Sequence, residues 1–175
     1  SKICRCFECR QVLYEESMFD GQKVSKSRII TSVDYSMVSM EAFEIYAANH
    51  DIHVMDFVLK LDAYSYYMMN LLDYLIGNTD RHWGNWGFLV DNRTNQPIRL
   101  FDLMDLNQTF LAYDTIEGAN CMTTGNRKMS QREAAVEAVK IIGLNQRDEI
   151  KDEWFEGRDK EREMFWNRFG ILKEQ

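Results

Sequence analysis

The chain has 175 residues, of which 45% are hydrophobic and 28% charged, and its formal net charge is −7. This composition is typical of one globular domain or a large lobe, and it argues against disorder. The acidic balance argues against a broad nucleic-acid-binding face, although a small phosphorylated ligand can still bind through a metal ion. No membrane-spanning run or signal-peptide pattern is found in the sequence, so a cytoplasmic location is expected.

The first 38 residues contain no long periodic segment. Two short runs of strand-forming residues flank a turn, at 11–14, Asp20–Gly21 and 28–31. Residues 1–38 are therefore predicted to form short strands and loops.

Two helices are predicted next. Ser39 is a suitable N-cap for a helix that ends near Asn49. From about 53 to 76, apolar residues recur every three or four positions, which predicts a helix that stops at Gly77 and Asn78. Its last turns are apolar nearly all the way round, so we expect this helix to be the buried centre of the lobe.

A pair of short strands is predicted after that helix. Residues 86–90 and 98–101 are rich in strand-forming residues. Residues 91–97 between them are dense in turn formers and include the only proline. The two strands should therefore pair as a β-hairpin.

The remainder is predicted to be helical. Ser130 and Glu133 form the pattern of a capping box at the start of a helix over 129–142. One or two more helices are expected after it, including 159–169. The predicted fold class is therefore mostly α with a small β-hairpin, an α+β fold.

Three of the four cysteines form the pattern Cys4-x-Cys6-x-x-Cys9. A structural zinc site needs a fourth ligand, and no second pair of ligands follows at zinc-finger spacing. Reduced thiols are the favoured interpretation. A small zinc-bearing structural domain is the alternative.

Polar residues in the loop after the buried helix suggest a catalytic site. Asp80 and Asn85 are five positions apart, the spacing at which protein kinases place a catalytic carboxylate and a metal-binding amide. Asp105 follows the second strand of the hairpin, which returns the chain to the same loop. Carboxylate and amide oxygens suit Mg²⁺, so the pattern predicts a phosphotransferase site. Asp102 is interpreted as a turn residue at the strand end.

The run from Gly77 to Asn85 resembles the catalytic loop of HipA-like serine/threonine kinases. Its Asp-Arg-His-x-x-Asn core is also similar to that of phosphatidylinositol kinases. Leu100-x-x-Leu-Met-Asp105 is similar to the metal-binding segment of the HipA-like family, and the resemblance is strongest over residues 61–110.

This resemblance implies a role for each matching residue. Asp80 is the catalytic carboxylate, and Asn85 and Asp105 bind Mg²⁺ and, through it, ATP. His82 approaches the transferring phosphoryl group, and Arg81 pairs with a carboxylate near the loop. The resemblance also implies a protein substrate with a Ser or Thr acceptor, and it leaves room for an antitoxin-like partner.

The domain organisation follows from the same resemblance. Residues 39–175 match a kinase-like C-terminal lobe, with a catalytic loop at 77–87 and a metal-binding segment at 100–107. Residues 1–38 then represent a remnant that links to an absent N-terminal lobe.

The sequence departs from a complete kinase in its nucleotide-binding parts. It contains no Gly-x-Gly-x-x-Gly pattern, and nothing around Lys23 or Lys26 marks an ATP-binding lysine. The isolated chain is therefore expected to be inactive. A non-catalytic kinase-like module that binds a partner is the alternative function.

Overall fold

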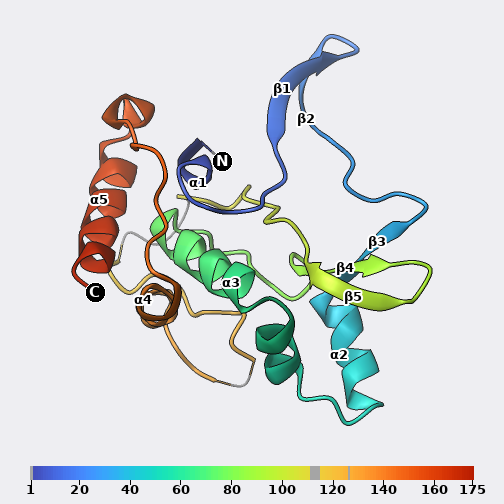
Figure 1. Cartoon of the computed structure of the whole chain (residues 1–175). Helices are drawn as coiled ribbons and strands as arrows, with labels where there is room; N and C mark the ends of the chain where they lie inside the picture. Colours follow the sequence, from blue (N-terminus) through green and yellow to red (C-terminus); the bar gives the residue numbers. More distant parts are fainter. Residues whose placement is uncertain (1, 111–114, 126) are drawn as a thin grey trace.

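Helix α3 (Val54–Leu75) is the longest element and runs through the middle of the molecule (Figure 1). The computed structural model describes residues 2–110, 115–125 and 127–175. The predicted helix over 53–76 is confirmed, and its burial is concentrated in its second half. All residues from Met68 to Leu75 are buried, so the prediction of a buried helix end is also confirmed.

Helix α3 is interrupted at Asp62, which has non-helical φ and ψ of −156° and 63°. The Asp62 carboxylate accepts from the backbone N–H of Ser65 at 3.2 Å, as an N-cap does for a new helical segment. It also accepts from the backbone N–H of Leu100 at 3.1 Å and from the guanidinium of Arg10 at 2.6 Å. These contacts compensate the interruption, and the apolar periodicity gives no sign of them.

The site-bearing sheet has three antiparallel strands in the order β3-β4-β5, formed by β3 (Tyr35–Ser39), β4 (Gly87–Asp91) and β5 (Gln96–Leu100). The predicted hairpin is confirmed as β4 and β5, whereas β3 was not predicted. At Gly87 an added Cβ atom would lie 2.1 Å from the carbonyl oxygen of Val38. The close pairing of β3 with β4 therefore requires glycine at this position.

The second sheet is the hairpin of β1 (Tyr14–Phe19) and β2 (Gln22–Ser27), which projects from the rest of the molecule (Figure 1). The predicted turn at Asp20–Gly21 is confirmed, and both residues have positive φ. The predicted strands at 11–14 and 28–31 are wrong in position. In a hairpin with a two-residue turn, the residues on either side of the turn pair with each other, here Phe19 with Gln22. The strands therefore adjoin the turn directly.

The other helices surround α3 and are α1 (Lys2–Arg5), α2 (Met40–Ala48), α4 (Gln131–Ile142), η1 (Asp152–Phe155, a 3-10 helix) and α5 (Asp159–Lys173). Ser39 caps α2, and Ser130 forms the predicted capping box with Glu133 at α4. The chain is thus α+β, as predicted, with five α-helices and two small sheets in its described part. None of the helices described is both long and apolar enough to span a membrane.

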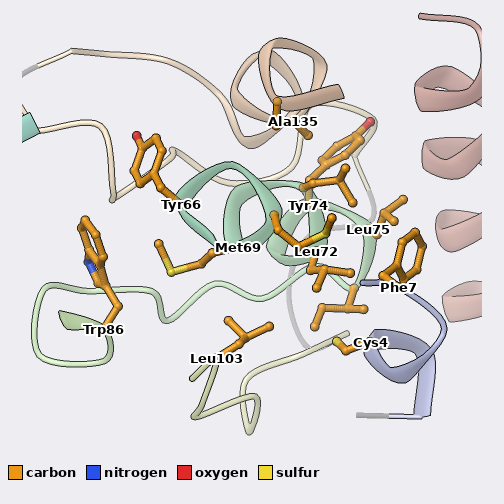
Figure 2. Packing of buried hydrophobic residues seen from close by; sticks show 14 of the residues in the cluster. Cys4, Phe7, Tyr66, Met69, Leu72, Tyr74, Leu75, Trp86, Leu103 and Ala135 are labelled. Carbon is orange, nitrogen blue, oxygen red and sulfur yellow. The ribbon is translucent and has the colours of Figure 1, made fainter. Parts of the chain in front are cut away.

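The core joins the N-terminal segment to the helices, as Figure 2 shows. Cys4 and Phe7 belong to the same buried cluster as Leu72 and Leu75 of α3. Strand β3 runs across the expected boundary between residues 38 and 39. The division into a remnant and a lobe remains a prediction, but residues near both ends of the proposed remnant take part in the folded body.

Candidate active site

The loop with the proposed catalytic residues begins where α3 ends. The chain turns at Gly77, which has a φ of 61°, and a side chain there would meet Met164 Cε at 3.0 Å. Asn78 is fully buried, and its amide donates to Asp73 at 2.8 Å. Its backbone carbonyl accepts from the Gln131 side chain at 2.5 Å. Helices α3 and α4 therefore hold the start of the loop in place.

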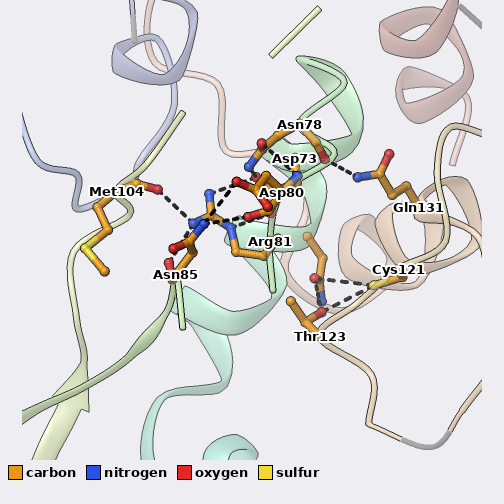
Figure 3. A network of polar contacts seen from close by, with 10 residues as sticks. Asp73, Asn78, Asp80, Arg81, Asn85, Met104, Cys121, Thr123 and Gln131 are labelled. Carbon is orange, nitrogen blue, oxygen red and sulfur yellow. Dashed lines mark hydrogen bonds and ion pairs between the residues drawn. The ribbon is translucent and has the colours of Figure 1, made fainter. Parts of the chain in front are cut away.

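Arg81 lies at the centre of the loop with only 3% of its surface exposed. Its Nε and Nη2 atoms donate to the two carboxylate oxygens of Asp73 at 2.8 and 3.0 Å (Figure 3). Its Nη1 atom donates to the backbone carbonyls of Asn85 at 2.8 Å and Met104 at 2.7 Å. The predicted pairing of Arg81 with a carboxylate thus occurs, and the partner is Asp73 of α3.

Burial by itself lowers the pKa of Arg81, because it disfavours the charged guanidinium. The attraction and hydrogen bonds of Asp73 outweigh this effect, so the net pKa is raised, and the charge of Asp105 contributes in the same direction. Arg81 is therefore positively charged, and it interacts electrostatically with Asp73 of α3 and with Asp105.

Asp80 and Asn85 contact each other within the loop. The amide nitrogen of Asn85 donates to the backbone carbonyl of Asp80 at 2.8 Å and lies 3.5 Å from its carboxylate Oδ2 (Figure 3). Because the amide nitrogen of Asn85 points at Asp80, the amide oxygen is the atom of this side chain that can bind a cation. The Asp80 side chain is 39% exposed, so its carboxylate is accessible from solvent.

His82 is the most exposed of the four proposed site residues that lie in or near this loop. Its Nε2 atom lies 3.8 Å from Oδ1 of Asp80, and 48% of its side chain is exposed. The Nδ1 atom accepts from the backbone N–H of Gly84 at 3.0 Å. The ring is therefore oriented by the loop itself with one edge toward the proposed catalytic carboxylate.

Asp105 and Asp102 differ in their surroundings. Asp105 adopts a positive φ of 53° and directly follows Met104, whose carbonyl is bound by Arg81. Asp102 instead accepts from Arg99 at 2.6 Å, with 17% of its side chain exposed. Asp102 is therefore engaged in a local ion pair three residues apart, which agrees with its interpretation as a strand-end residue.

The donor atoms at this site suit magnesium. Mg²⁺ usually takes one or two carboxylates from the protein and completes its shell with water and phosphate oxygens. Within the described ranges, no three His, Cys, Asp or Glu side chains are grouped as metal ligands. A site here would therefore combine the amide oxygen of Asn85 and one or two carboxylates with oxygens from water or from a nucleotide. The convergence of Asp80, Asn85 and Asp105 on one ion stays a prediction.

The loop also contacts the segment that leads to α4. Trp83 donates from Nε1 to the backbone carbonyl of Met122 at 2.9 Å. It also lines a cavity of about 540 Å³ between α2, α3 and α4, whose described wall includes none of the four proposed site residues. Asp80 and His82 therefore lie on an open surface beside this cavity and not inside it.

Cys4, Cys6 and Cys9 are not grouped as possible metal ligands among the residues that the structure describes. Cys4 and Cys6 are buried, and all four cysteines of the chain are free. Burial raises the pKa of Cys4 to about 11 and that of Cys9 to about 12. Both thiols are therefore protonated in the metal-free chain, whereas zinc binding uses the thiolate form.

Sequence reasoning missed the partner that holds the loop. Asp73 is the only charged residue in the apolar run from Leu71 to Ile76, and 3% of it is exposed. A lone carboxylate in such a run needs a buried cation, and Arg81 follows eight positions later. The signal was present, but the backbone carbonyls that share Arg81 could not be read from it.

No protein-family model matches this chain, and no curated protein matches it. A solved structure that resembles it is that of a Helicobacter pylori proinflammatory kinase, CtkA, with a TM-score of 0.61 and 14% sequence identity. The match covers 99% of this chain and 80% of the kinase chain. The chain therefore has a kinase-like fold.

Proposed function

We propose that this chain is the catalytic lobe of an ATP- and Mg²⁺-dependent protein serine/threonine kinase of the HipA-like type. The observation that carries the proposal is the link through Arg81. It joins the loop with Asp80 and Asn85 to the residue directly before Asp105. The catalytic loop and the segment after the hairpin are therefore linked in space as well as in sequence order. The likeness to a kinase fold supports the same proposal.

Each residue has a role in the proposed reaction. Asp80 accepts the proton of the acceptor hydroxyl and orients it for attack. Asn85 and Asp105 hold Mg²⁺, which neutralises charge on the nucleotide phosphates when it is bound. His82 donates from Nε2 toward Asp80 or toward the phosphoryl group. The acceptor is proposed to be a Ser or Thr of a protein, and an antitoxin-like protein is a proposed partner.

The isolated chain is proposed to bind nucleotide weakly and to be inactive. Lys26 pairs with Glu15 inside the β1–β2 hairpin at 3.9 Å, and Lys23 is exposed on the same hairpin. Neither lysine has a described contact with the site. With a net charge of −7, the attraction for a triphosphate comes mainly through Mg²⁺. Isothermal titration should show weak binding of Mg²⁺–ATP or none, and radiolabel assays should show no phosphate transfer.

A more sensitive test uses ³¹P NMR of millimolar Mg²⁺–ATP. The chain should broaden the β- and γ-phosphate signals, and Asp105→Ala should abolish this effect while Asp102→Ala retains it. Broadening that survives in Asp105→Ala would contradict the proposed metal site. Complete absence of broadening in the wild type would favour the alternative function, a non-catalytic module.

One observation favours that alternative. The β1–β2 hairpin projects from the body with two large apolar side chains near its turn, Met18 at 61% and Phe19 at 69% exposure. An isolated two-stranded hairpin is marginally stable by itself, and exposed apolar residues on it are typical of a surface that meets another protein. Nucleotide binding at Asp105 discriminates between the two functions.

A further inference from the structure

The guanidinium of Arg81 divides its donors between two kinds of partner. One edge, formed by Nε and Nη2, is bidentate to the Asp73 carboxylate at 2.8 and 3.0 Å. The remaining nitrogen, Nη1, takes two backbone carbonyls at 2.8 and 2.7 Å. Because a guanidinium is planar and rigid, the positions of these carbonyls relative to α3 are fixed together.

The two carbonyls belong to the two segments that carry the proposed metal ligands. One is the carbonyl of Asn85 itself, and the other is that of Met104, which is joined by a peptide bond to Asp105. The segments are far apart in sequence, and a single nitrogen atom holds them at a common point (Figure 3). Movement of either segment away from the other therefore breaks a hydrogen bond of a buried charged group, which is costly.

Charge explains why Asp73 is needed beside Arg81. An unpaired buried cation close to Asp105 would repel Mg²⁺ from that carboxylate. Arg81 and Asp73 have 3% and 4% of their side chains exposed, so they form a dry pair with no net charge. The pair can thus hold the two segments together without adding net charge beside Asp105.

We infer that Arg81, neutralised by Asp73, is a positioning residue that sets the separation of Asn85 and Asp105 for joint metal binding. This inference rests on the proposed function, and it adds to it the residue pair that assembles the metal site from the loop and the hairpin. Arg81 does not contact the metal or the reacting atoms in this role. It acts through the backbone of both ligand segments.

The test uses ¹⁵N-labelled full chain titrated with Mn²⁺ alone, which is a paramagnetic probe of Mg²⁺ sites and reports weak binding. In the wild type, the amide signals of Asn85 and Asp105 should broaden together at the same Mn²⁺ concentration. In Arg81→Lys, the concentration for half-maximal broadening should rise by about tenfold or more, as expected when an outer-shell partner of a metal site is lost. The signals of the two segments should also no longer broaden in parallel.

The matched control is Arg99→Lys. Arg99 likewise donates to an aspartate, Asp102, at 2.6 Å and to a backbone carbonyl, that of Leu100, at 2.8 Å. Its contacts are local and do not join the two segments. Arg99→Lys should therefore keep the wild-type Mn²⁺ response, even though it also alters an arginine that pairs with an aspartate and a backbone carbonyl.

A second variant separates positioning from folding. Replacing the pair together, as Asp73→Leu with Arg81→Met, removes both charges without leaving either one unpaired, so the fold is more readily retained. Circular dichroism and the melting temperature report folding, and the Mn²⁺ titration reports the site. A folded double variant with weakened and non-parallel broadening supports the inference.

Two outcomes contradict it in different ways. If Arg81→Lys and the double variant keep the wild-type response while Asp105→Ala loses it, the positioning role is wrong and the proposed function stands. If the wild type shows no broadening at Asn85 or Asp105, the metal site itself is wrong, and the positioning role is wrong with it.

Discussion

The backbone N–H of Gly84 donates a hydrogen bond to Nδ1 of His82 at 3.0 Å. A backbone N–H can only donate, so Nδ1 carries no proton in this arrangement. In the neutral ring, the proton is therefore on Nε2, the atom that lies 3.8 Å from Asp80. The loop thus selects the tautomer of His82 that presents a donor to the proposed catalytic carboxylate.

This arrangement predicts the tautomer of two histidines. Long-range ¹H–¹⁵N NMR should show His82 mainly as the Nε2–H form. His50 is an internal reference, because its Nδ1 lies 2.8 Å from the carbonyl of Tyr46 and must donate to it, which requires the Nδ1–H form. Gly84→Ala should give a mixture of tautomers at His82 alone, since the new Cβ would lie 2.8 Å from His82 Cε1. An unchanged spectrum in Gly84→Ala would contradict the assignment.

The two aspartates after the hairpin should differ in function. In a form of the protein that transfers phosphate, Asp105→Ala should lower the rate by about 100-fold or more, because it removes a charge that holds the metal. Asp102→Ala should largely keep activity and lower the free energy of unfolding by about 1 kcal/mol through loss of its pair with Arg99. Initial rates and denaturant unfolding of both variants check this. The reverse pattern would assign the metal to Asp102.

The contact of β3 with β4 makes Gly87 sensitive to the smallest substitution. In Gly87→Ala, the added methyl group would lie 2.1 Å from the carbonyl oxygen of Val38, so the strands must separate. We expect the free energy of unfolding to fall by about 3 kcal/mol. Gly170→Ala in α5 is the control, because nothing lies within 4 Å of the added atom. It should be neutral or stabilise the protein by about 0.5–1 kcal/mol. Equal effects of both substitutions would be inconsistent with the tight pairing.

Burial of Cys4 should make stability depend on alkaline pH. Its pKa is raised from 9.0 to about 11 in the folded chain, so the unfolded thiol loses its proton first as pH rises. The resulting stabilisation is complete below pH 9 and is lost as pH increases toward 11, by about 2–3 kcal/mol at most. Denaturant unfolding between pH 8 and 11 should show a steeper loss for the wild type than for Cys4→Ala. Parallel curves would mean that Cys4 is not buried as a neutral thiol.

Local patterns predicted the elements whose causes are local. Ser39 and Ser130 act as N-caps, and Asp20–Gly21 forms a turn, because these features depend on a few neighbouring residues. Strand β3 was missed because its pairing with β4 is decided some 50 residues away. The shift of the β1–β2 strands shows that turn geometry outweighed the strand propensity of individual runs.

The candidate site was predicted to a similar extent. The spacing of Asp80 and Asn85 was visible in the sequence, and the structure places them in contact. The link through Arg81 to Met104, the residue before Asp105, was not visible, because it uses a backbone carbonyl 23 positions away. Backbone acceptors are the same for every residue, so a sequence cannot indicate which of them a buried arginine selects.

The break in α3 at Asp62 has a consequence for the order of folding. Its carboxylate joins a new helical start to Leu100 and Arg10, which are 38 and 52 positions away. Loops of this length must close before these contacts can form, so they are expected to arise after the main barrier is crossed. Asp62→Ala should therefore accelerate unfolding and leave the refolding rate nearly unchanged in stopped-flow experiments. The residue that interrupts the central helix then stabilises the native state through contacts that form late in folding and slow unfolding.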